Sequence, residues 1–285
     1  MIIVKTSVKL VQIIKDRRQQ NAIIGFIPTM GALHQGHFEL LKKGVEKNCT
    51  TICSIFVNPT QFNEKSDFEN YPVTIEKDIY MLEKAGCDIL FLPSVTEMYP
   101  PQETTVLNIN LGNLGQLLEG KHRPGHFDGV CTIVDKLIRI VLPDILFLGQ
   151  KDYQQCMVIK SMIKQSTYSI TPQIEIVPTV REASGLAMSS RNKRLSETDI
   201  VKATSISRTM NYIKNHYKSI DYTALHKQAT LMLEEAGFSP IDYIAIADAE
   251  NLAPVEAPGT YNHKMVVLIA AYLNGVRLID NMNLS

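Results

Sequence analysis

Short apolar runs alternate with stretches of helical periodicity over the first two-thirds of this chain, and this alternation constrains the fold more than any other feature. The runs are rich in β-branched residues and have the length of strands; they occupy residues 22–29, 51–57, 88–94, 144–150 and 173–179. Between them, apolar residues recur three or four positions apart, as in the helical segments 75–85 and 130–141. The sequence therefore predicts an α/β domain, with a Rossmann-like open parallel sheet and helices on both faces.

The pattern changes after Arg181, where the segment REASGLAMSSRN is polar and rich in small residues. Ser196 and Asp199 then form a capping-box sequence that opens a helical region. Further on, a strand candidate spans 242–248, and Asn274-Gly275 joins two apolar runs as a β-hairpin turn would. We predict a first domain over residues 1–183 and a smaller C-terminal α+β domain, acting as a lid, over 184–285.

The composition of the chain indicates which kinds of partner it is unsuited to bind and where in the cell it is expected. Lys+Arg and Asp+Glu both number 29, so the formal net charge of +0 does not favour binding to nucleic acid or to an acidic membrane. The 5 cysteines lie mostly in apolar runs, with no CxxC pair, and are expected to be reduced core thiols. The N-terminus lacks the pattern of a signal peptide, and no apolar run reaches the ~18 residues of a membrane span. A cytosolic (cytoplasmic) protein is expected.

The segment PTMGALHQGH, residues 28–37, is the sharpest candidate for a binding site, because it joins the first predicted strand to the next helix. Gly31 and Gly36 allow the backbone to approach a ligand, and a helix start offers unpaired N–H groups with a partial positive charge. This combination is typical of a phosphate site. His34 and His37 share a helix face and could donate hydrogen bonds to charge that grows as pyrophosphate leaves.

Two other interpretations of this pair of histidines stay open at this point. HxxH could be half of a metal site, although the sequence has no HExxH or Cys/His cluster to supply the remaining ligands. Alternatively, the two rings could simply cap the helix and pack against their neighbours.

Polar residues also follow two other predicted strands. Asn58 and Gln61 lie in the FVNPTQF segment, and their neutral amides suit the binding of hydroxyl and carboxylate groups. Lys151, Asp152 and Gln155 lie in GQKDYQQ, where a lysine could serve as a mobile charge for a phosphate. Either segment alone could be an ordinary turn or a solvated helix start. Polar and basic groups follow three of the predicted strands, and this repetition favours a single ligand site formed by the three segments.

Two further segments carry positive charge. Lys121, His122, Arg123 and His126 surround a Pro-Gly turn in LLEGKHRPGHFDGV, which could be a basic flap over phosphates or a solvated loop. The segment AMSSRN, residues 187–192, offers two hydroxyls and Arg191 beside the predicted domain boundary. These groups suit a second contact with a triphosphate.

Taken together, these motifs resemble a known family. A nucleotide-binding sheet with HxGH and a later MSSR loop is similar to the nucleotidylyl transferase superfamily, in which HIGH and KMSKS have these roles. PTMGALHQGH, FVNPTQF, GHFDGV, FLGQKDYQQ and VREASGLAMSSRN, in this order and spacing, closely resemble the pantoate–β-alanine ligase family, over nearly the whole chain.

This resemblance implies a two-step reaction, in which ATP activates pantoate as pantoyl adenylate and β-alanine then displaces AMP. It also implies Mg²⁺ and a homodimer. His37 would be the proton donor, with His34, Lys151 and Arg191 as further catalytic residues; Gln61 would bind pantoate and later β-alanine, and Gln155 would bind pantoate, beside Asn58. The implied ATP-binding residues are Met30, Gly31, Ala32, Leu33, His34, Gln35, Gly36, His37, Gly149, Gln150, Lys151, Asp152, Val180, Met188, Ser189, Ser190 and Arg191.

The chain departs from the family patterns at two positions. Ala187 stands where KMSKS has its first lysine, which argues against an aminoacyl-tRNA synthetase, and Gln150 stands where many relatives carry an acid. Glu76 and Asp78 are considered as magnesium ligands or as a solvated helix face. Two alternative functions remain: a nucleotidyltransferase that adenylylates a phosphorylated cofactor precursor, and a non-catalytic nucleotide-sensing or RNA-binding relative. The second is disfavoured, because no Lys/Arg stripe with interleaved aromatic residues is present.

Overall fold

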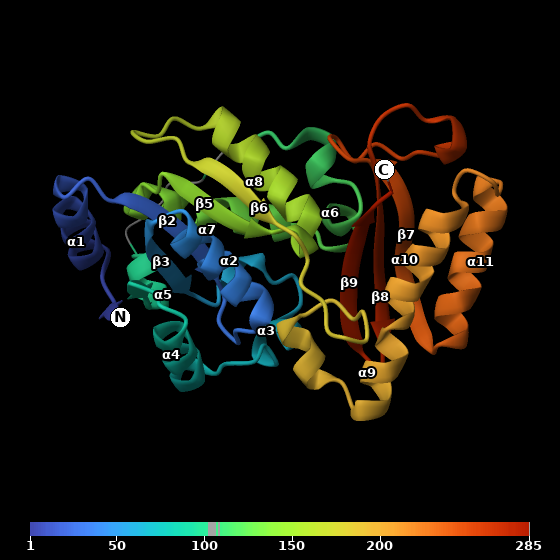
Figure 1. The fold of residues 1–285 in the computed structure, drawn as a ribbon, viewed down its shortest axis with the longest axis horizontal. Coiled ribbons are helices and arrows are strands. Elements are labelled where there is room, and N and C mark those ends of the chain that lie inside the picture. The colour runs from blue at the N-terminus through green and yellow to red at the C-terminus, as the bar shows by residue number, and fades with distance from the viewer. Residues whose placement is uncertain (102–106, 108, 285) are drawn as a thin grey trace. The chain divides into compact units, whose positions relative to one another are not determined.

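The computed structural model describes residues 1–101, 107 and 109–284, and it has the predicted alternation of strands and helices (Figure 1). In chain order, the elements are β1 (Ile2–Val4), α1 (Ser7–Gln19), β2 (Ile23–Thr29), α2 (Gln35–Glu46), β3 (Cys49–Ile55), η1 (Pro59–Gln61), α3 (Lys65–Glu69), α4 (Ile75–Lys84), β4 (Ile89–Phe91), α5 (Val95–Met98), η2 (Gly112–Gly115), α6 (Glu119–His122), α7 (His126–Val141), β5 (Ile145–Gly149), η3 (Gln150–Asp152), α8 (Tyr153–Gln165), β6 (Gln173–Val177), η4 (Ser190–Arg194), α9 (Glu197–Ala203), α10 (Ser205–His216), α11 (Tyr222–Glu235), β7 (Phe238–Asp248), η5 (Pro258–Thr260), β8 (Met265–Leu273) and β9 (Val276–Asn283).

These elements form two compact units. The first contains Met1–Gly149 and Val158–Pro178, and the second contains Gln150–Met157 and Thr179–Ser285. Residues Gln150–Met157 therefore group with the C-terminal part of the chain, which the composition of the sequence did not indicate. The reason lies in hydrogen bonds to the C-terminal part, such as that from the Tyr153 hydroxyl to the Ala249 carbonyl (2.7 Å).

The first unit is built on a six-stranded sheet in the order β1-β4-β3-β2-β5-β6. Every strand pair in it is parallel, which confirms the predicted open parallel sheet. The predicted strand at 51–57 is displaced: β3 begins at Cys49 and ends at Ile55, since it pairs with β2 along its whole length. The edge strand β1 was missed because three residues are too few to show a period.

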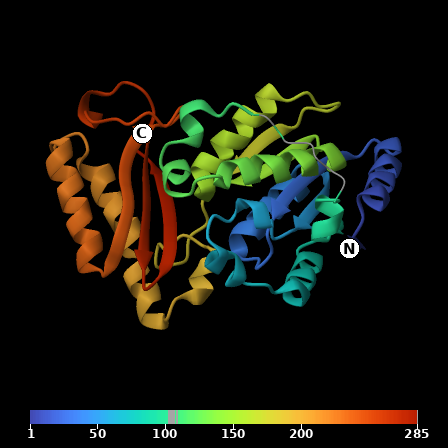
Figure 2. The ribbon, with the colours of Figure 1, turned by 180° about the vertical axis from the view of Figure 1, so that it is seen from behind.

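Helices cover both faces of this sheet: α2 lies in front of it in Figure 1, and α7 lies in front in Figure 2, which is seen from behind. One core cluster joins Leu40 and Leu41 of α2 to Leu82 of α4 and to the strands. Val45 of α2 faces outward and is 48% exposed. Gly44 takes the inward position instead, where any side chain would meet Thr51 of β3.

The strand order gives this sheet a topological switch point beside β2. From β2 the chain passes to β3 and β4 on one side, and β5 then pairs with the opposite edge of β2. Ligands of open α/β sheets bind beyond the carboxyl ends of the strands at such a point. The segment that follows β2, which contains both candidate histidines, therefore lies where the topology favours a ligand.

The second unit contains a three-stranded antiparallel sheet in the order β7-β8-β9. Helices α10 and α11 lie side by side on one face of it (Figures 1 and 2). The predicted hairpin is confirmed: Asn274 and Gly275 have φ values of 46° and 76°, as a tight turn between β8 and β9 needs. Strand β7 begins earlier than predicted, at Phe238, because register shifts between Phe238 and Tyr243 accommodate Pro240.

The cysteines and the helices agree with two expectations of the sequence analysis. All five cysteines are buried. Burial raises the pKa of the Cys87 thiol to about 11 and that of Cys131 to about 12, so both stay protonated and unreactive at neutral pH. Within the described part of the chain, no helix combines the length and apolar character that crossing a bilayer would require.

Candidate active site

One buried carboxylate fixes the backbone of the segment between β2 and α2. Its backbone turns through positive φ at Gly31 (81°) and Ala32 (51°). The two oxygens of Asp78, on α4, accept the N–H groups of Ala32 (2.8 Å) and Leu33 (2.9 Å), and one of them also accepts the Thr74 hydroxyl (3.1 Å). This side chain is only 2% exposed. The loop conformation is therefore fixed by the rest of the unit before any ligand binds.

The two histidines cap the helix that follows them. The Gly36 N–H donates to Nδ1 of His34 (3.2 Å), and the His34 N–H donates to Nδ1 of His37 (3.2 Å). The ring centroids are 4.1 Å apart. Because both Nδ1 atoms accept, the proton of each neutral ring must be on Nε2. Both rings therefore cap the helix, and the caps place the proton of each neutral ring on Nε2.

Of the two alternatives for Asp78, a magnesium ligand or part of a solvated helix face, the second does not hold, because this carboxylate is buried and already accepts three hydrogen bonds. Those bonds make it a poor magnesium ligand. Glu76, which precedes it in the first turn of α4, is exposed. In residues 1–101, 107 and 109–284, no group of three or more His, Cys, Asp or Glu side chains is arranged to hold a metal ion.

The loop after β3 holds Gln61 through Asn58. Asn58 is 1% exposed, and its Nδ2 donates to Oε1 of Gln61 (3.2 Å) and to the Gly129 carbonyl (3.1 Å). Its Oδ1 accepts the hydroxyls of Tyr99 (2.8 Å) and Thr60 (3.1 Å). Nε2 of Gln61 donates to Sδ of Met30 (2.9 Å), which joins this loop to the segment after β2. The two predicted sites of the first unit are therefore in contact.

The flap hypothesis does not hold for two of its four residues. His126 is 6% exposed and its Nδ1 lies 2.7 Å from the Gln61 carbonyl, so it packs beneath the Gln61 loop. Arg123 lies 3.6 Å from the carboxylate of Glu119, which is 7% exposed. Lys121 is exposed. Arg123 and His126 are thus part of the structure under Gln61 and not a mobile cover.

In the second unit, one asparagine holds the predicted GQKD segment. Nδ2 of Asn281, on β9, donates to the carbonyls of Gln150 (3.0 Å) and Lys151 (2.8 Å). Nζ of Lys151 lies 3.5 Å from Asp152, and the lysine side chain is 16% exposed. Gln155 follows on α8, where it is half-buried. The backbone at Lys151 is therefore fixed by β9.

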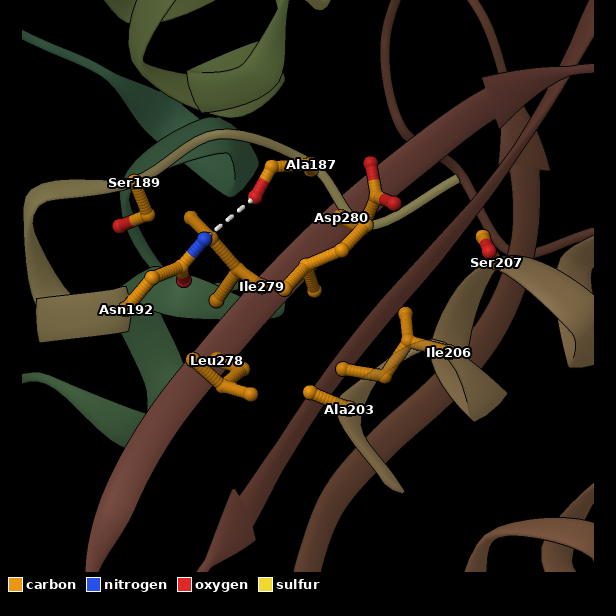
Figure 3. Close-up of a pocket in the computed structure, with 10 residues that line it drawn as sticks. Ala187, Ser189, Asn192, Ala203, Ile206, Ser207, Leu278, Ile279 and Asp280 are labelled. Atoms are coloured by element: carbon orange, nitrogen blue, oxygen red, sulfur yellow. Dashed lines mark hydrogen bonds between the residues drawn. The ribbon is translucent and has the colours of Figure 1, made fainter. Parts of the chain in front are cut away.

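The MSSR loop belongs to the same unit and is closed by its own hydrogen bonds. The Met188 N–H donates to the Val180 carbonyl (3.0 Å), and Nδ2 of Asn192 donates to the Ala187 carbonyl (3.0 Å; Figure 3). Ser189 caps η4 by accepting the Arg191 N–H on its hydroxyl (3.3 Å). Ser190 and Arg191 thus begin a short helical turn, with Ser189 at its start.

An ion pair ties this loop to β9. Arg181 donates through both terminal nitrogens to Asp280 (2.5 and 3.0 Å), and further to the Gly185 and Asn281 carbonyls. Asp280 is 5% exposed; burial raises the pKa of its carboxyl, and the Arg181 guanidinium opposes that shift. Adjacent residues of β9, Asp280 and Asn281, therefore hold both the MSSR loop and the GQKD segment.

The sequence pattern did not indicate that Asp78, Asp280 and Asn281 anchor the candidate loops. Asp78 lies in the first turn of a helix, where acidic residues are common, so its type gave no signal. Asp280 and Asn281 could have been recognised from the sequence. They are two consecutive polar residues, of types that are depleted in strands, within an otherwise apolar run.

Comparison with known proteins identifies the family of this chain. The family model described as pantoate-beta-alanine ligase matches residues 2–283. A protein of Magnetococcus marinus named pantothenate synthetase is 43% identical over 268 residues, which cover 93% of this chain and 91% of the relative. One of Cytophaga hutchinsonii with the same name is 41% identical over 269 residues, covering 94% and 93%.

Two solved structures are also similar. The pantothenate synthetase of Thermus thermophilus superposes with a TM-score of 0.89 at 34% identity, covering 100% of this chain and 99% of that one. The pantoate-beta-alanine ligase of Francisella tularensis, complexed with beta-gamma ATP and beta-alanine, gives a TM-score of 0.82 at 38% identity, covering 100% and 98%. The chain therefore belongs to the pantoate–β-alanine ligase family.

Proposed function

We propose that this chain joins pantoate to β-alanine at the expense of ATP, as an AMP-forming ligase. The observation that carries the proposal is the reciprocal cap of His34 and His37 at the switch point of the parallel sheet. With the ring proton on Nε2, each neutral ring lies at the start of a helix, where anionic groups bind. The Francisella relative, whose structure contains an ATP analogue and β-alanine, supports the choice of substrates.

Neither step of the proposed reaction requires an oxidant or a reductant. In the first, a carboxylate oxygen of pantoate attacks the α-phosphorus of ATP, and the bond to the β-phosphate oxygen breaks, which releases pyrophosphate. In the second, the amine of β-alanine attacks the acyl carbon, loses a proton and displaces AMP. Nε2–H groups of His34 and His37 would donate to the oxygens that gain charge as pyrophosphate leaves, with His37 as the proton donor.

The remaining predicted residues complete the proposal. Met30–His37, Gly149–Asp152, Val180 and Met188–Arg191 would bind ATP, and Lys151 and Arg191 would neutralise charge on its phosphates. Gln61 would bind pantoate and then β-alanine, and Gln155 and Asn58 would help to bind pantoate. Since the mixed anhydride hydrolyses in water, we also propose that residues 184–285 act as a lid during the reaction.

Mg²⁺, a homodimer and a cytoplasmic location belong to the proposal as well. Magnesium in nucleotide sites keeps several waters and is held by one or two carboxylates with substrate phosphates. A dedicated cage of protein ligands is therefore unnecessary. In that role the ion would neutralise phosphate charge, and the engaged oxygens of Asp78 would not contribute.

The test is to incubate the protein with ATP, Mg²⁺ and pantoate, with and without β-alanine, while following pyrophosphate and AMP separately. About one equivalent of pyrophosphate per site without the amine, then steady release of AMP and pantothenate when β-alanine is added, is expected. Pyrophosphate without any AMP, on addition of a phosphorylated cofactor precursor, would favour the nucleotidyltransferase alternative. Absence of pyrophosphate with pantoate would contradict the proposal.

A further inference from the structure

The GHFDGV segment, residues 125–130, has no role in the chemistry proposed above, yet it is built tightly into the candidate site. Gly125 has a φ of 77° and precedes α7, of which His126 is the first residue. Both His126 and Gly129 are buried and contact the backbone of η1, which carries Gln61.

The hydrogen bonds of His126 determine its tautomer. Nη1 of Arg123 lies 3.1 Å from Nε2 of His126. A guanidinium can only donate, so Nε2 must accept and the ring proton must be on Nδ1. That Nδ1–H then donates to the Gln61 carbonyl at 2.7 Å. The direction of this bond follows from chemistry alone, and it places a fixed donor beneath Gln61.

Gly129, almost one helical turn later, brings the helix against the same loop. A Cβ at this position would lie 2.3 Å from the Thr60 carbonyl oxygen and 2.7 Å from the Gln61 nitrogen. Only glycine therefore permits this approach. The Gly129 carbonyl accepts Nδ2 of Asn58, which also donates to Oε1 of Gln61. The start of α7 thus holds the backbone of Gln61 directly and orients its side chain through Asn58.

We propose that His126 is a positioning residue, which sets the affinity of Gln61 for the acid and for the amine. The inference rests on the proposed function, in which Gln61 binds pantoate and then β-alanine. Both ring nitrogens of His126 contact protein groups, so the ring acts on the substrates only through Gln61. Its loss should change the Michaelis constants of the two substrates that Gln61 binds and spare that of ATP.

Three substitutions separate hydrogen bonding from packing. In His126→Asn, the side-chain amide nitrogen can occupy the position of Nδ1 and donate to the Gln61 carbonyl. His126→Gln places its amide near Nε2 instead, and His126→Leu fills the space without a donor. Asp128→Asn is the matched control, since Asp128 is exposed on the same turn of α7.

We expect the KM for pantoate and for β-alanine to rise about 5- to 50-fold in His126→Leu and His126→Gln, the scale of one buried hydrogen bond left unmade. The KM for ATP should stay within about twofold, and His126→Asn should stay within about threefold of the parent protein throughout. If the leucine variant fails to fold, the comparison of asparagine with glutamine gives the same answer.

Equal constants for the asparagine and glutamine variants, or a parallel rise in the KM for ATP, would overturn the role of His126. That result is distinct from failure of the proposed function, in which the parent protein itself would release no pyrophosphate with pantoate.

Discussion

Each of the two units has a loop, proposed to bind ATP, that is anchored by a buried aspartate from a distant part of the sequence, but the two anchors differ in kind. In the first unit, Asp78 accepts backbone N–H groups of the histidine loop and a threonine hydroxyl, all of them neutral donors. In the second unit, Asp280 pairs with a guanidinium, that of Arg181, beside the MSSR loop. A carboxylate can thus fix a loop through its backbone or through a single charged side chain.

The difference has consequences for how the loops respond to substitution. Asp78 fixes the peptide groups at Ala32 and Leu33 directly, so the loop cannot move without leaving buried donors unpaired. Asp280 fixes a side chain at the base of its loop, and the segment around Ser189 and Arg191 depends on its own hydrogen bonds. We expect the histidine loop to be the more rigid of the two.

The largest effect is expected from His37→Ala, which removes a proposed donor as well as half of the helix cap. Adenylation should slow by about 10² to 10⁴, the usual scale for a positioned acid or oxyanion donor. Loss of the cap should reduce the free energy of unfolding by only about 0.5–2 kcal/mol. Single-turnover release of pyrophosphate and urea unfolding measure the two. A drop of about tenfold or less would exclude His37 from the chemistry.

Asp280→Ala tests the charged anchor. Removing one partner of a buried ion pair typically costs about 3–5 kcal/mol. We expect the lower value, about 3 kcal/mol, because the Arg181 side chain is 25% exposed and water can partly solvate its charge when Asp280 is removed. Guanidinium unfolding would measure the loss. The double variant Arg181→Met, Asp280→Leu should regain most of the stability, and an equally unstable double variant would show that the charges are not the cause.

Asp78→Asn tests the neutral anchor with little change in shape. The NH₂ group of asparagine cannot accept a hydrogen bond, so one of the two backbone N–H groups that donate to Asp78, at Ala32 or Leu33, would lose its acceptor. We therefore expect a loss of about 1–3 kcal/mol in the free energy of unfolding. Adenylation should also slow, since Ala32 and Leu33 lead directly to His34. Lys77→Gln, exposed on the same helix, is the control. An unchanged stability would mean that the loop holds its conformation by itself.

The smallest effect is expected from Asn281→Leu, which removes the donor to the Gln150 and Lys151 carbonyls. We expect a loss of about 1 kcal/mol in stability and a several-fold rise in the KM for ATP, because the backbone of Lys151 is released. Asn283→Leu, at an exposed position of the same strand, is the matched control. A KM for ATP equal to that of the control would show that Lys151 is positioned by other contacts.

The sequence predicted the parts of this protein that depend on neighbouring residues. The parallel sheet, the helices over 75–85 and 130–141, and the hairpin at Asn274-Gly275 all follow from local periodicity or turn chemistry. The short strand β1 and the early start of β7 were missed, because pairing with a neighbouring strand decided them.

Local chemistry also indicated the histidine, NPxQ, GQKD and MSSR segments as candidates for binding, since unusual residue types stand at the ends of predicted strands or beside the predicted domain boundary. What only the tertiary structure decided is how these segments are held. Asp78 reaches Ala32 across 46 residues of sequence, Asp280 pairs with Arg181 across 99, and His126 meets Gln61 across 65. Local patterns cannot encode such contacts, because a buried carboxylate or imidazole is distinguished from an exposed one only by the partners that folding brings to it.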